Sequence, residues 1–415
     1  MEKKRKAPVL RFKDTNGKDY PAWEQRKLED ICDVRDGTHS SPKYFDNGFP
    51  LVTSKNLRDG VIDLSDVQLI SKEDYLEINK RSKVDLNDIL MSMIGTIGNL
   101  ALIKEEPTFA IKNVALIKST DKVKMDYLFS YLSSPSSKCD IDKSVEGGTQ
   151  KFLSLTKVRG LKILLPGIEE QQKIGSFSVL LDGVITLHQR KLEALKKLKR
   201  TLLQKMFPKK GHLKPELRFF GFTNDWEQRK LGELAATFGY GLNAAAKSFD
   251  GRHKYIRITD IDESTRRFLC SSLTSPDIDF EEAAPYRLAE GDVLFARTGA
   301  SVGKSYRYVR TDGEVYFAGF LIRFRFKDKE AAEFVFQNSL TAKFQNFIKT
   351  SSQRSGQPGI NAQQFSGYQI AVPNSEERER IGSFFSRLDT AITLHQRKLE
   401  IYKKLKKGLL QKMFI

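Results

Sequence analysis

TLHQRKLE occupies residues 186–193 and occurs again at residues 393–400. It is the centre of a longer repeat, because residues 166–207 return without a gap as residues 373–414, and 28 of these 42 positions are identical. PVLRF at 8–12 returns as PELRF at 215–219, and WEQRKL at 23–28 returns unchanged at 226–231. About 140 largely diverged residues follow each WEQRKL. A repeated framework with divergent inserts predicts two different readers on one symmetrical scaffold.

The composition is typical of a folded, basic protein. A chain of 415 residues has room for two or three domains, and 40% of its residues are hydrophobic. No apolar run approaches the roughly 18 residues of a membrane span, and we expect the N-terminal MEKKRKAPVLRF to be a basic arm rather than a signal peptide. Cys32, Cys139 and Cys270 lie far apart without a metal-ligand grouping, which favours a reducing cytosol and no bound metal.

The formal charge of +18, from 70 Lys and Arg against 52 Asp and Glu, favours a polyanionic partner. Nucleic acid is the commonest polyanion in a cytosol. Residues 186–214 alone carry ten Lys or Arg and a single acid, Glu193. These cations either follow phosphates or solvate the outer face of a helix.

The 42-residue repeat predicts two long helices. Acids that follow Pro166 and Pro373 suit the positive ends of new helices, and Pro208 ends the first one. A helix from Ile174 to Phe207 would be about 50 Å long. Apolar residues that are mostly three or four apart form a stripe on each helix, at Val184, Leu187, Leu192, Leu195, Leu198, Leu202 and Met206, and at Ala391, Leu394, Leu399, Tyr402, Leu405, Leu409 and Met413.

Neither helix can bury its stripe alone, so we expect the two stripes to pack on each other. Near-identical patterns related by a twofold axis run antiparallel, which predicts an antiparallel coiled coil. Such a pair would act as a spacer between the inserts. A coiled coil with no further role accounts for most of the stripe residues.

Both inserts are predicted to be β-rich, which with the long helices gives an α+β fold class. Their strands are indicated by β-branched and aromatic segments that end in Gly, Asn or Asp turns. Aligning Asp88 with Asp292 and Leu57 with Ile261 gives the same offset of 204, so the inserts share a fold. Residues 125–134 and 332–349 are predicted to be helical.

Base reading requires Arg, Lys, Asn and Gln on rigid loops, because their paired donors and acceptors match purine edges in the major groove. For each candidate taken alone, solvated surface is a better explanation than a base contact. The set as a whole lies in matching positions of the two inserts, and base contact and solvated surface explain it equally well. The predicted DNA-binding residues of the first insert are Thr38, His39, Ser40, Lys43, Ser54, Lys55, Asn56, Gln150 and Lys151. Those of the second insert are Arg257, Thr259, Asp260, Arg297, Arg354 and Gln357.

No catalytic motif is complete in this chain. GASVGKS at 299–305 has three residues between its first Gly and GK, where a phosphate-binding P-loop needs four. The five histidines form no metal motif, and neither an adenine methyltransferase tetrapeptide nor a nuclease carboxylate set is present. We therefore predict no catalytic residues, no metal site and no chemistry of the chain's own.

The chain resembles the DNA specificity subunits of type I restriction-modification systems over essentially all of its length. The resemblance rests on PxLRF with WEQRKL, on the GDVLFARTGASVGK landmark at 291–304, and on the block from Pro166 to Phe207, which occur in family order. The first insert departs from the pattern because its GTIG loop is followed by no basic residue. Equivalent phosphate contacts need not occur in both halves.

The resemblance implies a basic arm (1–22), a first target-recognition domain (23–165), a helical spacer (166–214), a second target-recognition domain (215–372) and a C-terminal helical region (373–415). It implies that each domain reads one half of a split site in double-stranded DNA. It also implies partners, namely two methyltransferase subunits and endonuclease subunits that translocate DNA, inside a bacterial or archaeal cytoplasm. S-adenosylmethionine, ATP and Mg are expected on those partners and no cofactor on this chain.

The repeated helix faces are expected to dock the methyltransferase. The predicted partner-binding residues are Leu187, His188, Leu192, Leu198, Leu394, His395, Leu399 and Leu405. Two alternatives remain open at the level of sequence. The chain could serve a related methyltransferase-nuclease system, or it could be a basic coiled-coil scaffold without sequence preference, which would bind any duplex with a steep salt dependence.

Overall fold

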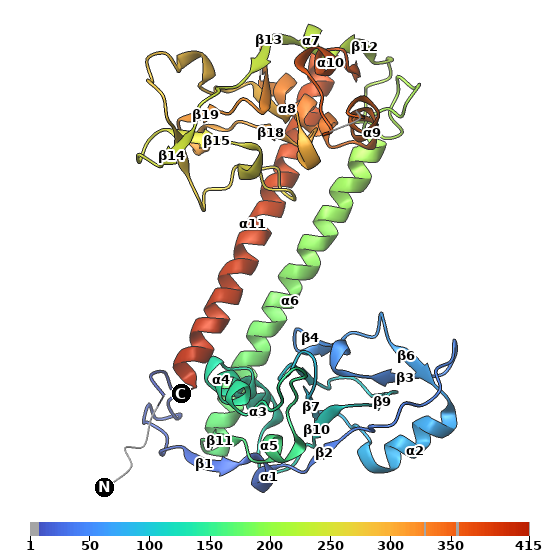
Figure 1. Cartoon of the computed structure of the whole chain (residues 1–415), viewed down its shortest axis with the longest axis vertical. Helices are drawn as coiled ribbons and strands as arrows, with labels where there is room; N and C mark the ends of the chain where they lie inside the picture. The colour runs from blue at the N-terminus through green and yellow to red at the C-terminus, as the bar shows by residue number, and fades with distance from the viewer. Residues whose placement is uncertain (1–7, 328, 354–356, 415) are drawn as a thin grey trace. The chain divides into compact units, whose positions relative to one another are not determined.

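The computed structural model describes residues 8–327, 329–353 and 357–414, drawn in Figure 1. The chain divides into two compact units, the first made of the residues up to His188 and from Lys398 onward, and the second of Gln189–Arg397. Each unit contains one insert and a stretch of each long helix. Within the described ranges, no helix is long and apolar enough to cross a membrane.

Among its described residues, the first unit contains eleven short strands and helices α1 to α5, together with parts of α6 and of α11 (Ser375–Met413). Its strands are β1 (Glu24–Lys27), β2 (Val34–Asp36), β3 (Phe49–Val52), β4 (Leu57–Arg58), β5 (Val61–Ile62), β6 (Gln68–Ile70), β7 (Ile89–Ser92), β8 (Leu100–Leu102), β9 (Ala110–Ile111), β10 (Val114–Ile117) and β11 (Lys162–Leu165). Its helices are α1 (Leu28–Ile31), α2 (Lys72–Ser82), α3 (Met125–Leu132), α4 (Pro135–Lys143), α5 (Leu155–Arg159) and part of α6 (Ile168–Lys205).

The second unit follows the same plan. Its strands are β12 (Glu227–Lys230), β13 (Ala235–Tyr240), β14 (Ala246–Ser248), β15 (Lys254–Ile256), β16 (Thr274–Pro276), β17 (Asp292–Ala296), β18 (Ser305–Arg307), β19 (Val315–Phe317), β20 (Leu321–Phe326) and β21 (Gln369–Val372). Its helices are part of α6, α7 (Leu231–Leu234), α8 (Lys329–Ser339), α9 (Ala342–Ser351), α10 (Ala362–Ser366) and part of α11 (Ser375–Met413).

A four-stranded antiparallel sheet forms the centre of each insert, in the order β2-β10-β7-β8 and β13-β20-β17-β18. In the first unit, Ile89 and Met91 of β7 join one hydrophobic cluster while Leu90 joins another. Alternate residues therefore enter cores on opposite faces of the sheet, which explains why this strand is continuously apolar. The shared strand order confirms that the two inserts have one fold.

The WEQRKL repeats have a structural role in both units. β1 pairs antiparallel with β11 and β12 with β21, so EQRK lies beside the strand that leads into each long helix. The preceding Trp of each motif is buried. The repeated motif therefore joins the start of each insert to its end.

The predicted helices are present, with one difference. Residues 125–134 contain α3, whereas residues 332–349 are divided between α8 and α9. The division lies at Thr341, whose hydroxyl accepts a hydrogen bond from Phe344 N and caps α9. A Thr at this position favours a new helix start over continuation of the old one.

The long helices run antiparallel within each unit, as predicted. In the first unit, His188 stacks on Tyr402 with ring centroids 5.2 Å apart, and Lys406 forms an ion pair with Asp182 nearer the start of α6. In the second unit, Lys199 Nζ lies 2.6 Å from Asp389 Oδ1. The two ion pairs correspond at the repeat offset of 207. The α6 helix begins at Ile168 and ends before Pro208, so its predicted end is confirmed.

The predicted apolar stripe is wrong in part. Leu192, Met206 and Met413 are buried as expected, but Leu187, Leu198, Leu394 and Leu405 are 64%, 47%, 50% and 47% exposed. The buried positions are instead spaced alternately by four and three residues, as in a coiled-coil seam. They include Leu181, Ile185, Leu192, Leu388 and Ile392. Each helix therefore has a buried apolar face and additional exposed leucines, which the sequence pattern merges into one stripe.

Candidate nucleic-acid interface

Several loops meet at one edge of each central sheet. In the first unit, β2 ends at Asp36, Asn113 precedes β10, and Met93 follows β7. In the second unit, Tyr240 ends β13 and Phe320 precedes β20, while Arg297 follows β17. Because neighbouring strands are antiparallel, these positions lie side by side. We call them the strand-end edge of each unit.

At the first strand-end edge, the predicted residue His39 is held by two partners. Its Nδ1 lies 2.8 Å from Asn113 Oδ1 and its Nε2 lies 2.8 Å from Asp36 Oδ2. Arg81 also pairs with Asp36. The hydrogen bond with Asn113, followed by that with Asp36, raises the pKa of His39 above its ordinary value. The imidazole is 62% exposed as a side chain, so it faces solvent from a fixed position.

The rest of the predicted loop lies beside His39. Thr38 N donates to Ile111 O at 3.0 Å and Thr38 O accepts from Asn113 N at 3.1 Å, which fixes the backbone. Ser40 and Lys43 are exposed. Two exposed aromatic residues follow them, Tyr44 and Phe45, at 48% and 49% exposure. The structure thus places a cation and two aromatic rings in one exposed loop.

The closing Gly/Gln loops reach the same edges. In the first unit, Leu153 N donates to Met93 O at 2.8 Å, and Gln150 and Lys151 just before it are exposed. In the second unit, Gly299 N donates to Pro358 O at 2.9 Å, next to the exposed Gln357. Arg354, predicted in the same loop, lies outside the described residues.

Arg297 is the predicted residue of the second strand-end edge. Its guanidinium lies over the ring of Tyr240, 4.7 Å from the centroid. Its backbone N donates to Phe320 O at 3.0 Å, and its backbone O accepts from Ile360 N at 2.9 Å. Tyr240 and Phe320 are 44% and 62% exposed. An arginine and two aromatic rings are therefore presented together on a fixed backbone.

The other predicted segments have a structural role. Ser54–Asn56 is a short 3-10 helix, and the matching turn in the second insert is Ile258–Asp260. Asn56 is 2% exposed, donates to Asp63 O and Asp66 O, and accepts from Thr53 N, so the prediction of a base contact by Asn56 is wrong. Ser54 is also buried, at 6% exposure, so the prediction of a base contact by Ser54 is wrong as well.

In the matching turn, Arg257 and Asp260 form a two-bond ion pair, with Nε–Oδ2 at 2.9 Å and Nη2–Oδ1 at 3.0 Å. The pair occupies the groups that each residue would need for reading a base. Thr259 is exposed beside it and donates to Asp260 Oδ1 at 3.3 Å. In the first unit, Lys55 remains exposed and pairs with Asp66 at 3.3 Å.

The incomplete P-loop has a structural explanation. Lys304 is 9% exposed, and its Nζ donates to Ile261 O at 3.0 Å and lies 2.9 Å from Glu263 Oε2. The ammonium group of Lys304 therefore binds partners within the domain and is not directed at a phosphate. Its contacts tie the loop after β17 to the turn that contains Asp260.

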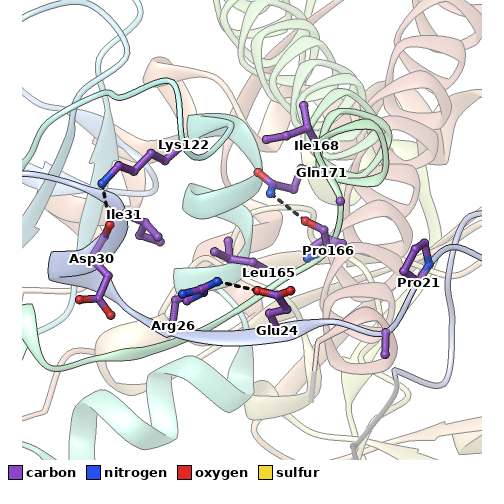
Figure 2. Close-up of a pocket in the computed structure, with 12 residues that line it drawn as sticks. Pro21, Glu24, Arg26, Asp30, Ile31, Lys122, Leu165, Pro166, Ile168 and Gln171 are labelled. Atoms are coloured by element: carbon purple, nitrogen blue, oxygen red, sulfur yellow. Dashed lines mark hydrogen bonds and ion pairs between the residues drawn. The ribbon is translucent and has the colours of Figure 1, made fainter.

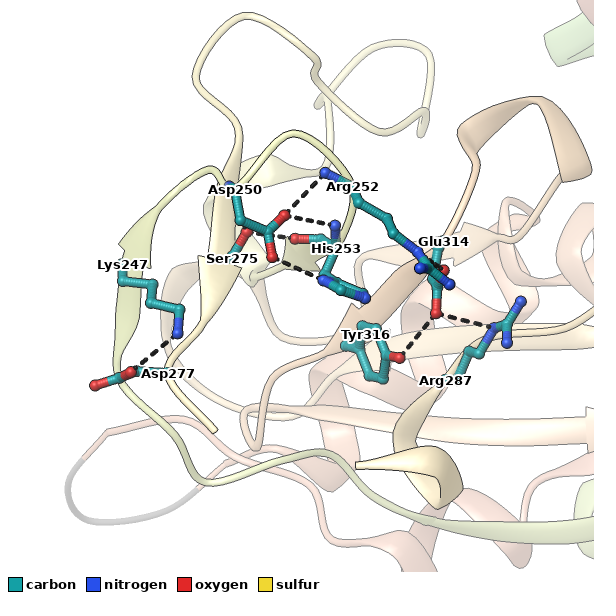
Figure 3. A network of polar contacts seen from close by, with 9 residues as sticks. All are labelled: Lys247, Asp250, Arg252, His253, Ser275, Asp277, Arg287, Glu314 and Tyr316. Atoms are coloured by element: carbon teal, nitrogen blue, oxygen red, sulfur yellow. Dashed lines mark hydrogen bonds and ion pairs between the residues drawn. The ribbon is translucent and has the colours of Figure 1, made fainter. Parts of the chain in front are cut away.

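Figure 3 shows a polar network within the second insert. His253 Nδ1 lies 2.7 Å from Asp250 Oδ2, but Ser275 Oγ donates to the backbone O of His253, at 2.6 Å. Although burial opposes ionisation, hydrogen bonds from Arg252 N and from His253 lower the pKa of Asp250 below its usual range. Because the Ser hydroxyl does not face the imidazole, these three residues are not a nucleophilic triad.

A cavity of about 530 Å³ lies near the start of α6 (Figure 2). Polar groups that line the cavity bind one another. Arg26 forms an ion pair with Glu24, and Gln171 Nε2 donates a hydrogen bond to Pro166 O at 2.9 Å. None of the predicted DNA-binding residues lines it. Among the described residues, no group of three or more His, Cys, Asp or Glu could hold a metal ion.

The predicted partner-binding residues fall into three classes, namely exposed, buried and intermediate. Leu187, Leu198, Leu394 and Leu405 are exposed and available to a partner, whereas Leu192 is buried at 5% exposure and serves the helix contact. His188, His395 and Leu399 are intermediate, and His188 stacks on Tyr402.

Sequence reasoning missed Asn113, Tyr240 and Phe320. Asn113 adopts a positive φ of 54°, a conformation in which Asn is enriched, but nothing in the sequence marks that requirement. Tyr240 and Phe320 are aromatic residues in β-rich segments, where most such rings are buried. Only their exposure distinguishes them from core residues.

Comparisons with known proteins give a consistent result. The family model described as "Type I restriction modification DNA specificity domain" matches residues 21–197 and 223–403. A protein of Methanocaldococcus jannaschii named as the type I restriction enzyme MjaX specificity subunit is 28% identical over 235 residues, which cover 53% of this chain and 55% of that protein. The type I restriction enzyme EcoBI specificity subunit of Escherichia coli is 35% identical over 130 residues, covering 31% of this chain and 27% of that one.

These alignments span about half or less of the relatives' own length. Solved structures agree in fold over almost the whole chain. A type I restriction-modification system S subunit from M. genitalium has a TM-score of 0.67 at 14% identity, covering 99% of both chains. A chain from a study of complex assembly in a type I restriction-modification system has a TM-score of 0.51 at 16% identity, covering 95% of this chain and 98% of that one.

Proposed function

Because the chain belongs to the family of type I restriction modification DNA specificity domains, we propose that it is the sequence-reading subunit of a type I restriction-modification complex. It would bind double-stranded DNA and read a split, asymmetric site. It would have no catalytic step of its own and would direct methyltransferase and endonuclease subunits to that site.

One observation carries this proposal. The two units share a sheet order and the loop contacts at the strand-end edge, yet the side chains at matching positions differ. Asp36 and Asn113 in the first unit correspond to Tyr240 and Phe320 in the second. A shared framework with different side chains at this edge, of which Tyr240 and Phe320 are exposed, suits the reading of two different half-sites. A scaffold without sequence preference would need no such difference.

The chemistry is assigned to the partners. Methylation of a base within a duplex requires that the base be flipped into a pocket, and nothing in the described residues supports such a pocket here. We propose that an adenine-N6 methyltransferase subunit supplies the pocket and S-adenosylmethionine, and that the endonuclease subunit uses ATP and Mg. A pair of methyltransferase subunits matches the two copies of the helical repeat.

Exposed leucines on the long helices are the proposed docking surface for the methyltransferase. Leu187 and Leu394 are repeat equivalents with 64% and 50% exposure, so they contribute little to the core of the isolated chain. Replacing either with Ser should reduce co-purification with the methyltransferase while leaving the melting temperature unchanged. Leu76→Ser, at a 53% exposed leucine of α2, is the matched control. Normal assembly by both helix variants would contradict this surface.

The function is tested by long-read methylation sequencing of plasmid DNA from cells that co-express this chain and the methyltransferase encoded beside it. One split motif with N6-methyladenine in each half would support the proposal. Exchanging one insert should then change one half only. Scattered methylation, or none despite a stable complex, would favour a scaffold role.

A further inference from the structure

At the second strand-end edge, Arg297 differs from most of the arginines that the structure describes in this insert, because its side chain has no polar partner. Arg252, Arg307 and Arg325 are each paired with a carboxylate, and Arg323 donates to a backbone carbonyl. The Arg297 guanidinium has no hydrogen-bond or ion-pair partner among the described residues. The N–H groups of this guanidinium therefore remain available to a ligand.

The guanidinium is nevertheless held in place. It stacks on Tyr240 at 4.7 Å, and the Tyr240 hydroxyl accepts a hydrogen bond from Ala362 N at 3.2 Å, which fixes the ring. The Arg297 backbone is fixed on both sides by Phe320 O and Ile360 N. Stacking covers the face of the guanidinium and leaves its N–H edge free, so little side-chain entropy is lost when that edge binds.

We propose that this edge reads a guanine in the major groove of DNA through Arg297. Two parallel N–H groups of an arginine match the O6 and N7 acceptors of guanine, which no other base presents together. The inference rests on the proposed function and deepens it by naming a reading residue and its base. Phe320, 62% exposed beside Arg297, supplies an apolar surface for the neighbouring base or sugar.

The first strand-end edge provides the contrast. At the position of Tyr240 it has Asp36, whose carboxylate pairs with Arg81 and His39. At the position of Arg297 it has Met93, which is 7% exposed. No stacked, unpaired guanidinium stands at this edge among the residues described. The two half-sites are therefore expected to differ at the base that this edge contacts.

The first test is methylation sequencing with co-expressed methyltransferase, comparing the unaltered chain with Arg297→Ala and Arg297→Lys. Exchange of the second insert first identifies which half of the motif it reads. The unaltered chain should require guanine at one position of that half. Both variants should relax the guanine requirement at that position and leave the other half of the motif unchanged. Arg297→Lys should relax it less than Arg297→Ala, because lysine keeps one hydrogen-bonding group at this site.

Controls separate reading from folding. Arg310→Ala removes an exposed arginine of the same insert, which pairs with Glu290 at 3.0 Å, and should leave the motif unchanged. Tyr240→Leu keeps Arg297 but removes the stacking ring, and should relax the same position partially. Melting temperature and co-purification with the methyltransferase establish that each variant is folded and assembled.

A binding assay tests the contact at the level of a single acceptor atom of guanine. Replacing the guanine by 7-deazaguanine removes the N7 acceptor and should weaken binding of the complex containing the unaltered chain by about 5- to 150-fold. The same DNA should cost the Arg297→Ala complex nothing further. A motif without guanine in that half, or an unchanged motif in Arg297→Ala, would overturn this inference alone. Absence of any split motif with the unaltered chain would instead overturn the proposed function.

Discussion

Arg11 and Glu170 lie 159 residues apart in sequence and form a partly buried ion pair, with Arg11 Nη2 2.7 Å from Glu170 Oε2. Trp23 Nε1 donates to the same carboxylate oxygen at 3.0 Å. The second unit repeats the arrangement with Arg218, Trp226 and Glu377, at 2.6 Å and 3.1 Å. Residues of PxLRF, of WEQRKL and of the start of the long helix thus meet in one contact, and this contact is present once in each unit.

Removing one of these carboxylates should be strongly destabilising. Glu170 is 0% exposed, so Glu170→Ala leaves the guanidinium of Arg11 and the indole N–H of Trp23 without their partner. We expect a loss of about 3–5 kcal/mol in the free energy of unfolding of the first unit. Urea titration followed by tryptophan fluorescence measures it. Glu24→Ala breaks an exposed pair with Arg26 and should cost less than about 1 kcal/mol; equal effects would contradict the buried role of Glu170.

The two tryptophans should report on separate units. Trp23 packs with Phe414 at 6.2 Å and Trp226 with Phe207 at 6.2 Å between ring centroids. In a Trp226→Phe background, Phe414→Ala should destabilise the transition reported by Trp23 by about 3–5 kcal/mol, because it opens a cavity in a packed core. In a Trp23→Phe background, Phe207→Ala should do the same for Trp226. An unaffected transition in either background would contradict the packing of that helix end.

The interhelical ion pairs should respond to charge reversal. Asp389→Lys places two cations together at Lys199, whose side chain is 13% exposed, and should lower the free energy of unfolding by about 1–3 kcal/mol. The double variant Lys199→Asp with Asp389→Lys should recover most of the loss, which thermal unfolding can measure. Additive effects of the two changes would show that the residues do not interact.

His39 should make the first strand-end edge sensitive to pH. Hydrogen bonds with Asn113 and Asp36 raise its pKa in the folded state above the ordinary histidine value of 6.5. Its contribution to stability is therefore complete below that value and is lost as pH rises through the folded-state pKa. The difference in unfolding midpoint between the unaltered chain and His39→Gln should be larger at pH 5.5 than at pH 8. An NMR titration of the imidazole should give a pKa above 6.5, and a value at or below it would contradict this geometry.

The thiols should differ in reactivity. Burial raises the pKa of Cys32 to about 12, whereas Cys139 and Cys270 are exposed. Because the thiolate is the nucleophile, iodoacetamide at pH 8 should modify Cys139 and Cys270 in the native chain and reach Cys32 only after unfolding. Peptide mass spectrometry locates the label. Rapid native labelling of Cys32 would show that the core around β2 is open.

Much of the framework could be predicted from sequence. The repeat predicted two related units because identical residues make identical local contacts, and the end of α6 followed from Pro208. The strand segments of the inserts were recognisable by their alternation. The stripe on the long helices was misassigned in part, since Leu187 lies three residues after Val184 and Leu198 three residues after Leu195, a spacing that is also typical of buried helix positions.

The site was only partly predictable. His39, Arg297 and Gln357 are residue types suited to base contacts, and the structure brings their loops to the strand-end edges. Asn56 and Arg257 are equally suited by residue type, yet their side chains form hydrogen bonds or ion pairs within the fold. Residue type alone does not reveal whether a polar side chain has already found its partner.

The sequence by itself determined that this chain has two copies of one framework, a basic surface and no complete catalytic motif, because these are properties of residue order and composition. Tertiary structure decided which polar residues remain free and which loops share an edge. Tyr240, Arg297 and Phe320 meet only because three antiparallel strands end together. Hydrogen bonds between strands distant in sequence set that register, and local sequence carries no record of it.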